Sequence, residues 1–176
     1  MKAIFLDIDG VLNSGQWFRK VRSTSWKWRQ MAGKYLSYSV DKKAIKLLNE
    51  IIEATDAKIV LSSSWRLGPP LVTLKVQFKE IGIDLYDKTP CWGELGITDW
   101  ESYKDESGQE HLRVIPRGDI IAKYLEEHPE FTSYVILDDV DQFNEEQHNH
   151  LVFTDREVGL TTSRSEERRV GKECRS

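Results

Sequence analysis

Short apolar runs alternate along the chain with segments in which apolar residues recur at helical spacing. The runs have the length of buried strands and cover residues 2–8, 58–61, 83–86, 133–137 and 151–153. Helical spacing covers residues 39–55, 71–81 and 117–128. Strands that alternate with helices in this way predict an α/β fold, in which helices cover both faces of a Rossmann-like parallel sheet.

Local signals place some of the element boundaries. Ser39 is expected to cap the first long helix, with Asp41 in its first turn. Gly82 is expected to end the second helix, and Pro129 stops the third. The polar and acidic residues 96–111 are predicted to form a long surface loop or a small insertion.

Composition narrows the class of protein. The 176 residues are 39% hydrophobic and 10% aromatic, which is enough to bury one core and argues against disorder. No apolar run approaches the length of a membrane span, and Asp7 and Asp9 interrupt the apolar N-terminus before it could act as a signal peptide. We therefore expect a cytoplasmic protein without membrane contact, folded as one domain over residues 1–163.

Residues 164–176 form a charge-mixed tail without the periodicity of a helix or a strand. A back-translation of this segment resembles a common sequencing adapter, so we interpret it either as non-native sequence or as a disordered, solvated terminus. The tail's five basic and three acidic residues leave a formal net charge of −6 on residues 1–163, against −4 for the whole chain.

The ends of three predicted strands carry polar residues. Asp7 and Asp9 follow the first strand, residues 62–64 are serines that follow the second, and Asp138 and Asp139 close the fourth. Because ligands bind beyond the carboxyl ends of parallel strands, we expect these residues to meet in one pocket. Carboxylates that converge there would repel one another unless a cation lay between them, and Mg²⁺ is the expected ion.

These motifs resemble those of the haloacid dehalogenase (HAD) superfamily of phosphohydrolases. The matching segments are DIDGVL at residues 7–12, IVLSSS at 59–64 and VILDD at 135–139. The segments SSWR at 63–66, RGDII at 117–121 and GLT at 159–161 further resemble the HAD-like domains of Swiss Army Knife RNA repair proteins. The resemblance implies a HAD-like fold with a small cap, for which residues 14–38 are the expected insertion.

The resemblance also implies a role for each matching residue. Asp7 would be the nucleophile, and Asp9 would protonate the leaving group and then activate water. The backbone carbonyl of Asp9 would also bind Mg²⁺, together with Asp7 and Asp139. Asp138 would be a second acidic ligand or a partner that orients the others.

The resemblance implies further residues around the phosphate. Arg117, at the start of a helix, is the predicted basic residue beside the nucleophile, and Lys123 is the alternative. Ser63 would hydrogen-bond the transferring phosphoryl group, a place that Ser62 would take in an alignment shifted by one residue. The expected substrate-binding residues are Gly10, Ser62, Ser64, Trp65 and Arg66. Trp65 and Arg66 would either contact the substrate or be a packed aromatic residue and a surface arginine.

The stretch between Asp9 and Asp41 contains no acidic residue. Basic and aromatic side chains interleave there over residues 17–35, on a body of net negative charge. Cations neutralise phosphates and aromatic rings stack on bases, so this segment indicates a nucleic-acid contact. The alternative is a short cap whose aromatic residues pack on the core and whose basic residues are solvated.

The favoured function is a Mg²⁺-dependent phosphatase with an aspartyl-phosphate intermediate, acting on a nucleotide or on a nucleic-acid terminal phosphate as in RNA repair. One alternative uses the same chemistry on a small phosphorylated metabolite. Another is a non-catalytic module that binds phosphate or RNA.

Overall fold

Five parallel strands form the central sheet of the computed structural model, which describes residues 1–22, 35–91 and 100–162. In sheet order β3-β2-β1-β6-β7, the strands are Leu85–Lys88, Lys58–Leu61, Lys2–Leu6, Ser133–Asp138 and Leu151–Phe153. The predicted parallel sheet is confirmed. Strand β3 begins two residues later than expected, because Ile83 still belongs to the turn that leaves the preceding helix and donates its amide to the carbonyl of Phe78 at 3.0 Å.

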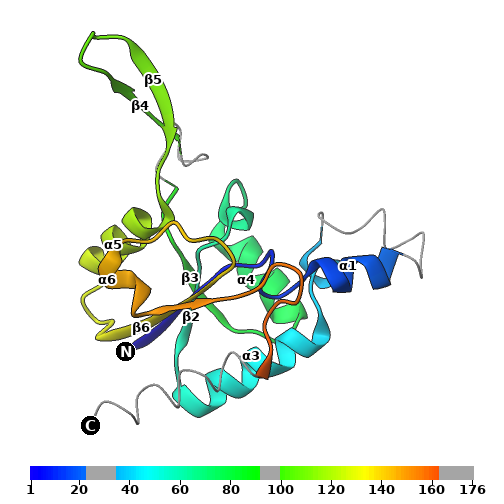
Figure 1. The fold of residues 1–176 in the computed structure, drawn as a ribbon. Coiled ribbons are helices and arrows are strands. Elements are labelled where there is room, and N and C mark those ends of the chain that lie inside the picture. The colour runs from blue at the N-terminus through cyan, green and yellow to red at the C-terminus, as the bar shows by residue number, and fades with distance from the viewer. Residues whose placement is uncertain (23–34, 92–99, 163–176) are drawn as a thin grey trace.

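Helices cover both faces of this sheet, as predicted. They are α3 (Lys42–Thr55), α4 (Leu71–Glu80), α5 (Arg117–Glu127) and the short α6 (Glu145–His148). Successive residues of β1 point to opposite faces, so Leu6 packs in one apolar core with α3 and α4, while Phe5 packs in a second core with α5. Figure 1 shows α5 on the opposite side of the strands from α3. No helix of the described residues is long and apolar enough to cross a membrane.

The start of α3 differs from the prediction. Asp41, and not Ser39, is the N-cap: its Oδ1 accepts a hydrogen bond from the amide of Lys43 at 2.9 Å. Ser39 is buried instead, at the end of the 3-10 helix η1 (Leu36–Tyr38). The amide of Asp41 also donates to the carbonyl of Leu12 at 2.6 Å, which ties the start of α3 to the loop that follows β1.

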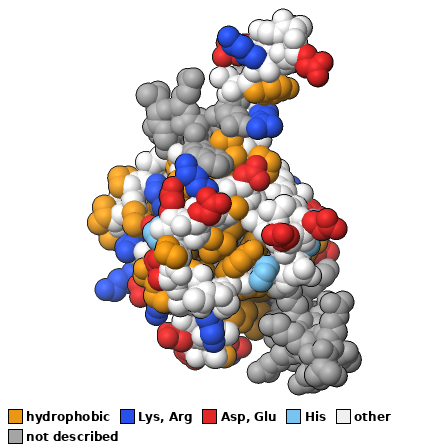
Figure 2. Space-filling view, turned by 90° about the vertical axis from the view of Figure 1, so that its left-hand side faces the viewer, with side chains coloured by type: hydrophobic (Ala, Val, Ile, Leu, Met, Phe, Trp, Pro, Cys, Tyr) orange, Lys and Arg blue, Asp and Glu red, His pale blue; other side chains and the backbone are white. Residues whose placement is uncertain are grey.

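Of the two alternatives for the polar segment 96–111, the structure shows a small insertion and not a long loop over the residues that it describes from Trp100 onward. Strands β4 (Trp100–Lys104) and β5 (Glu110–Val114) pair there as an antiparallel hairpin. The Asp105 carboxylate holds the turn by accepting hydrogen bonds from the amides of Ser107 and Gln109. The hairpin projects away from the sheet (Figures 1 and 2), and charged side chains of both signs lie near its tip. It is an insertion between β3 and α5, in addition to the one expected at residues 14–38.

The insertion predicted at residues 14–38 begins with helix α1 (Gly15–Arg22). None of the α1 residues is buried, and the helix carries Arg19, Lys20 and Arg22 in its last turn. Arg19 forms an ion pair with Glu157 at 2.5 Å, which ties α1 to the segment after β7. Residues 23–34, which hold the rest of the basic and aromatic segment, lie outside the described residues, as does the tail beyond residue 162.

Candidate active site

The register of the central strands brings the predicted site residues together. Strand β1 pairs with β6 so that Leu6 lies opposite Leu137, and the amide of Asp7 donates to the carbonyl of Leu137 at 2.9 Å. On the other side, the amide of Ser62 donates to the carbonyl of Leu6, also at 2.9 Å. Asp7, Ser62 and Asp138 therefore lie in one row along the carboxyl edge of the sheet.

Asp7, Asp138 and Asp139 form an acidic cluster, in which one carboxylate oxygen of each residue lies within 4.8 Å of the others. Arg117, the first residue of α5, faces two of these carboxylates. Its Nη1 lies 3.2 Å from Oδ2 of Asp7 and 2.5 Å from Oδ2 of Asp138. Arg156, in the turn after β7, pairs with the third: its Nε lies 2.6 Å from Oδ2 of Asp139.

Burial and mutual repulsion shift the pKa values in this cluster. Burial raises the pKa of Asp7, although Arg117 and the nearby hydroxyl of Ser63 act in the opposite direction. Burial and then the charge of Asp7 raise the pKa of Asp138 to about 6, again against the effect of Arg117. Burial disfavours the charged form of Arg117, but Asp7 and Asp138 outweigh this effect and raise its pKa, so it stays protonated. A divalent cation would favour the ionised carboxylates further.

The cluster has oxygens that fit a divalent cation. Oδ1 of Asp7 and Oδ1 of Asp139 are buried, and neither accepts a hydrogen bond of normal geometry from the described residues. Both oxygens of Asp138, by contrast, accept hydrogen bonds, one from the amide of Val140 and one from Arg117. A buried carboxylate oxygen without a partner is costly, and such oxygens are ligands that suit Mg²⁺. The donor set therefore fits a cation held by Asp7 and Asp139, with Asp138 orienting Arg117.

Asp9 is half-buried, and two donors from different parts of the chain hold its carboxylate outside this cluster. Nδ2 of Asn13 donates to Oδ1 of Asp9 at 2.8 Å, and the indole Nε1 of Trp65 donates to Oδ2 at 3.0 Å. Asn13 is itself fixed, because its Oδ1 accepts from the amide of Gly10 and its Nδ2 also donates to the carbonyl of Ser39, each at 2.9 Å. The Asp9 carboxyl group is thus positioned without joining the acidic cluster.

The three serines after β2 occupy different environments. Ser63 is completely buried and close enough to Asp7 to lower the pKa of that carboxyl group. Ser62 is also buried and extends the sheet through its amide, whereas Ser64 is exposed. The structure therefore brings Ser63 beside the predicted nucleophile.

Arg66 is not the surface arginine considered from the sequence. Its side chain is almost completely buried. The guanidinium donates to the backbone carbonyls of Ser63 at 3.1 Å and Pro90 at 3.4 Å, which links the segments that follow β2 and β3. These contacts place Arg66 in the framework behind the serines.

Lys123, the alternative to Arg117, lies further along α5. Its Nζ is 4.0 Å from Oε1 of Glu127, one turn further along the same helix, and its side chain is partly exposed. Arg117 is the residue that the structure places beside Asp7.

Comparison with known families is consistent with this geometry. A family model for the HAD domain in Swiss Army Knife RNA repair proteins matches residues 3–164, nearly the whole chain. The chain belongs to this family of HAD domains. Neither a curated protein nor a solved structure matches it significantly. The resemblance and the Rossmann-like fold expected from the motifs are thereby confirmed.

The HAD domain contains site residues that the motifs did not identify. Asn13 lies four residues after Asp9 and could have been considered as a partner for it, since an amide side chain can both donate and accept. Arg156 and Thr154 follow the last strand, where no sequence signal marks them. Thr154 donates its hydroxyl to the carbonyl of Gly10 at 2.9 Å, so the segment after β7 supports the loop that carries Asp9.

Removal of the indole donor tests the positioning of Asp9. We expect Trp65→Phe to keep the aromatic packing but lose the hydrogen bond to Oδ2 of Asp9. A hydrogen bond to a charged group is worth roughly 1.5–3 kcal/mol, so we expect kcat to fall by about tenfold or more with little change in KM. Steady-state kinetics on an aryl phosphate measures this, and an unchanged kcat would show that Trp65 does not position Asp9.

The backbone conformation and a close neighbour both favour glycine at position 10. Its φ of +76° lies in the left-handed region, and a Cβ at this position would lie 2.2 Å from Oδ2 of Asp139. The backbone strain alone is worth about 1–2 kcal/mol, while the clash would also displace an acidic residue of the cluster. Gly82, with φ of +81° and no atom closer than 3.9 Å to its added Cβ, has the strain without the clash.

We therefore expect Gly82→Ala to lower the free energy of unfolding by about 1–2 kcal/mol, and Gly10→Ala to lower it further, because the clash with Asp139 adds to the backbone strain. Only Gly10→Ala should also abolish the stabilisation that we expect Mg²⁺ to confer. Denaturant melts with and without Mg²⁺ compare the two variants. Retention of the full Mg²⁺ effect in Gly10→Ala would mean that Asp139 does not need to lie against Gly10.

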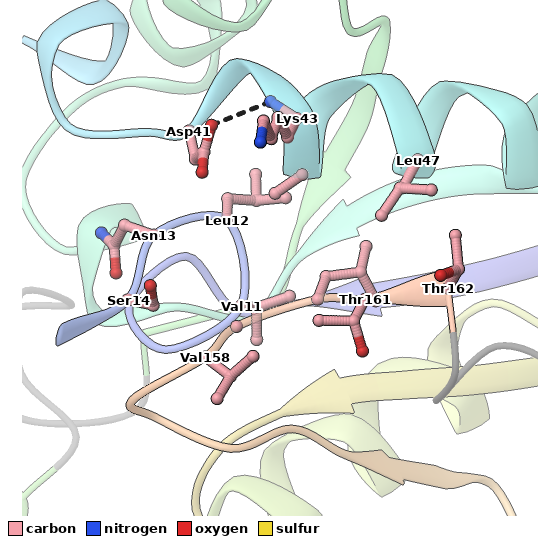
Figure 3. Close-up of a pocket in the computed structure, with 13 residues that line it drawn as sticks. Val11, Leu12, Asn13, Ser14, Asp41, Lys43, Leu47, Val158, Thr161 and Thr162 are labelled. Atoms are coloured by element: carbon pink, nitrogen blue, oxygen red, sulfur yellow. Dashed lines mark hydrogen bonds between the residues drawn. The ribbon is translucent and has the colours of Figure 1, made fainter. Parts of the chain in front are cut away.

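A separate hollow lies between the start of α3 and the segment 158–162 (Figure 3). Leu12, Leu47 and Thr161 are among the residues that line it, and the capping carboxylate of Asp41 lies at its edge. Its described lining residues include neither the acidic cluster nor Arg117. The hollow is thus distinct from the candidate active site, which lies at the carboxyl edge of the sheet.

Proposed function

We propose that this HAD domain is a Mg²⁺-dependent phosphomonoesterase that forms an aspartyl-phosphate on Asp7. The observation that carries the proposal is the convergence of three groups at one sheet edge: the buried Asp7, the guanidinium of Arg117 beside it and the separately held Asp9. They supply a nucleophile, a cation for the phosphoryl charge and a proton donor, which are the groups that this reaction requires.

In the first half-reaction, a carboxylate oxygen of Asp7 attacks the phosphorus, and the bond from phosphorus to the ester oxygen breaks. Asp9 gives a proton to that oxygen, so the leaving group departs as an alcohol. Arg117 and Ser63 would bind oxygens of the group in transfer. A Mg²⁺ ion held by Asp7 and Asp139 would neutralise the charge of the carboxylates and of the phosphoryl oxygens.

In the second half-reaction, Asp9 is a carboxylate and takes a proton from water as the water oxygen attacks phosphorus. The bond between phosphorus and the Asp7 oxygen breaks, which releases phosphate and restores the Asp7 carboxylate. The hydrogen bonds from Asn13 and Trp65 hold Asp9 in the same place for both proton transfers. Asp9 is thereby returned to its protonated state for the next substrate.

The proposed substrates are the terminal phosphates of nucleic acids or nucleotides. Membership of a family from RNA repair proteins supports this class. The surface of α1 supports it as well: Arg19, Lys20 and Arg22 are exposed, and the rings of Trp17 and Phe18 lie edge to face with their centroids 5.0 Å apart. Cations beside aromatic rings suit a single-stranded nucleic acid.

Charge reversal on α1 tests this substrate class. We expect Lys20→Glu with Arg22→Glu to weaken binding to a 5′- or 3′-phosphorylated oligonucleotide by about an order of magnitude at low salt. The loss should shrink as salt rises, because counterion release drives such contacts. Turnover of a small aryl phosphate should stay the same. Fluorescence anisotropy and steady-state kinetics give the two readouts.

The matched control reverses two exposed lysines on another helix, Lys75→Glu with Lys79→Glu on α4. This control should bind the oligonucleotide as the wild type does. Equal losses of oligonucleotide binding and of aryl phosphate turnover in the α1 variant would instead assign α1 a structural role as a cap.

A substrate screen tests the function itself. Purified protein with Mg²⁺ should release phosphate from phosphorylated oligonucleotides or nucleotides faster than from sugar phosphates. Faster turnover of a small phosphorylated metabolite would support the proposed phosphatase chemistry but contradict the proposed class of substrate. Tight binding of phosphate esters without any turnover would identify a non-catalytic binding module and overturn the proposal.

A further inference from the structure

Arg156 is the one guanidinium at the described acidic cluster that is exposed to solvent. Its side chain is 72% exposed, whereas that of its partner Asp139 is 1% exposed and that of Arg117 is 20% exposed. The Arg156 head group thus reaches from the surface to a buried carboxylate. Arg117, held by Asp7 and Asp138 together, is fixed from two sides.

The backbone that carries Arg156 is firmly anchored. The amides of Val158 and Gly159 donate to the carbonyl of Asp155, which closes a tight turn. The carbonyl of Arg156 accepts a hydrogen bond from the amide of Gly15, at the start of α1, at 3.0 Å. Movement of the Arg156 head group would therefore come from its own side-chain rotations and would not require a shift of the loop.

Arg156 occupies one oxygen of a carboxylate whose other oxygen fits a cation. It pairs with Oδ2 of Asp139, and Oδ1 of the same carboxylate is one of the two buried oxygens without a hydrogen-bond donor among the described residues. Asp7, Asp138 and Asp139 carry three negative charges against the two positive charges of Arg117 and Arg156. The Arg156 end of the pair is exposed, so water can solvate the released guanidinium while a divalent cation replaces its charge at the buried Asp139 carboxylate.

We propose that the ion pair between Arg156 and Asp139 breaks when a divalent cation binds. The released guanidinium of Arg156 then binds the phosphoryl group of the substrate from the solvent side. This role rests on the proposed function, because it assigns Arg156 to the same phosphoryl group that Asp7 attacks. The planar guanidinium can donate two parallel hydrogen bonds to phosphate oxygens. Binding of the cation thus frees Arg156 to bind the phosphoester.

Two calorimetric titrations test the exchange without turnover. The first adds Mg²⁺ alone, and the second adds inorganic phosphate in the presence of saturating Mg²⁺. For Arg156→Gln we expect Mg²⁺ to bind about two- to fivefold more tightly than in the wild type, because a competing cation is removed. Phosphate should bind about tenfold or more weakly, because a charge-assisted contact is lost.

Arg113→Gln is the matched control, since Arg113 is an exposed arginine on the projecting hairpin. This variant should bind Mg²⁺ and phosphate as the wild type does, which separates a local effect from a change of net charge. Thermal melts of both variants verify that they are folded.

The opposite results would overturn the inference. Mg²⁺ affinity that is unchanged or lower in Arg156→Gln would show that Arg156 does not compete with the cation, and unchanged phosphate affinity would show that it does not reach the phosphoryl group. Neither titration needs catalysis. A wild type that binds Mg²⁺ but hydrolyses no ester would therefore overturn the proposed activity alone, while the Arg156 exchange would still be decided by the titrations.

Discussion

Asp7→Asn is expected to abolish phosphatase turnover while the fold stays intact. The carboxamide is nearly isosteric with the carboxylate but is a far poorer nucleophile, so we expect kcat to fall by roughly 10⁴ or more. Thermal stability without Mg²⁺ should be equal or higher, because burial already disfavours the charged carboxylate and raises the pKa of Asp7. Steady-state kinetics on an aryl phosphate and a thermal melt provide the two measurements.

The control for this substitution is Asp84→Asn, at an exposed aspartate before β3. It should leave both turnover and stability unchanged. Normal turnover by Asp7→Asn would refute the covalent mechanism, whereas loss of activity together with unfolding would assign Asp7 a structural role.

Removal of the divalent cation is expected to have an equally large effect. Chelation should eliminate turnover, because Asp7 and Asp139 present buried oxygens that have no hydrogen-bond donor among the described residues. Mg²⁺ at about one hundred times its Kd should add about 2.7 kcal/mol to the free energy of unfolding. In a domain of this size that corresponds to a Tm rise of about 5–10 °C.

Two variants at neighbouring positions test whether the Tm rise comes from Mg²⁺ bound at a specific site or from general screening of negative charge. Asp139→Asn should lose most of the Tm rise that Mg²⁺ produces in the wild type. Asp141→Asn should keep it, because Asp141 is exposed and pairs with His148 instead of the cluster. Equal activity in EDTA, with the metal content shown to be nil, would contradict a role for the cation.

The central part of the site was predictable from the sequence for a simple physical reason. Asp7, Ser63 and Asp138 each lie at or just beyond the end of a strand with a recognisable apolar run. Parallel pairing then places these ends along one edge of the sheet. Arg117 was expected only from the resemblance, which implies a basic residue at the start of the helix before the strand that carries the acidic pair.

The hairpin was not predictable from hydrophobic periodicity. Strands β4 and β5 project from the body, and most of the side chains that the structure describes on them are exposed, as those of a polar loop would be. Local chemistry holds the pair instead: the ring of Tyr103 stacks on His111, and Arg113 lies over the Tyr103 ring. These contacts are between residues that a composition-based analysis assigns to a polar loop.

The contacts around Asp9 and Asp139 also lacked a sequence signal, because they join distant segments. Trp65 reaches Asp9 across 56 positions, and Arg156 follows Asp139 by 17 positions through a strand and a turn. Arg66 was misplaced for a related reason, since an arginine is usually exposed unless partners satisfy its guanidinium. Here the backbone carbonyls of Ser63 and Pro90 are such partners.

The most direct test of the central claim is the intact mass of Asp9→Asn after incubation with Mg²⁺ and an aryl phosphate. A good leaving group needs little help from an acid, so phosphoryl transfer to Asp7 should proceed, while hydrolysis slows by roughly 10²–10⁴ without the Asp9 base. We predict that the spectrum shows one added phosphoryl group on Asp9→Asn and none on Asp7→Asn treated in the same way. Phosphate release by Asp9→Asn at the wild-type rate, or an added phosphoryl group on Asp7→Asn, would contradict the proposed mechanism.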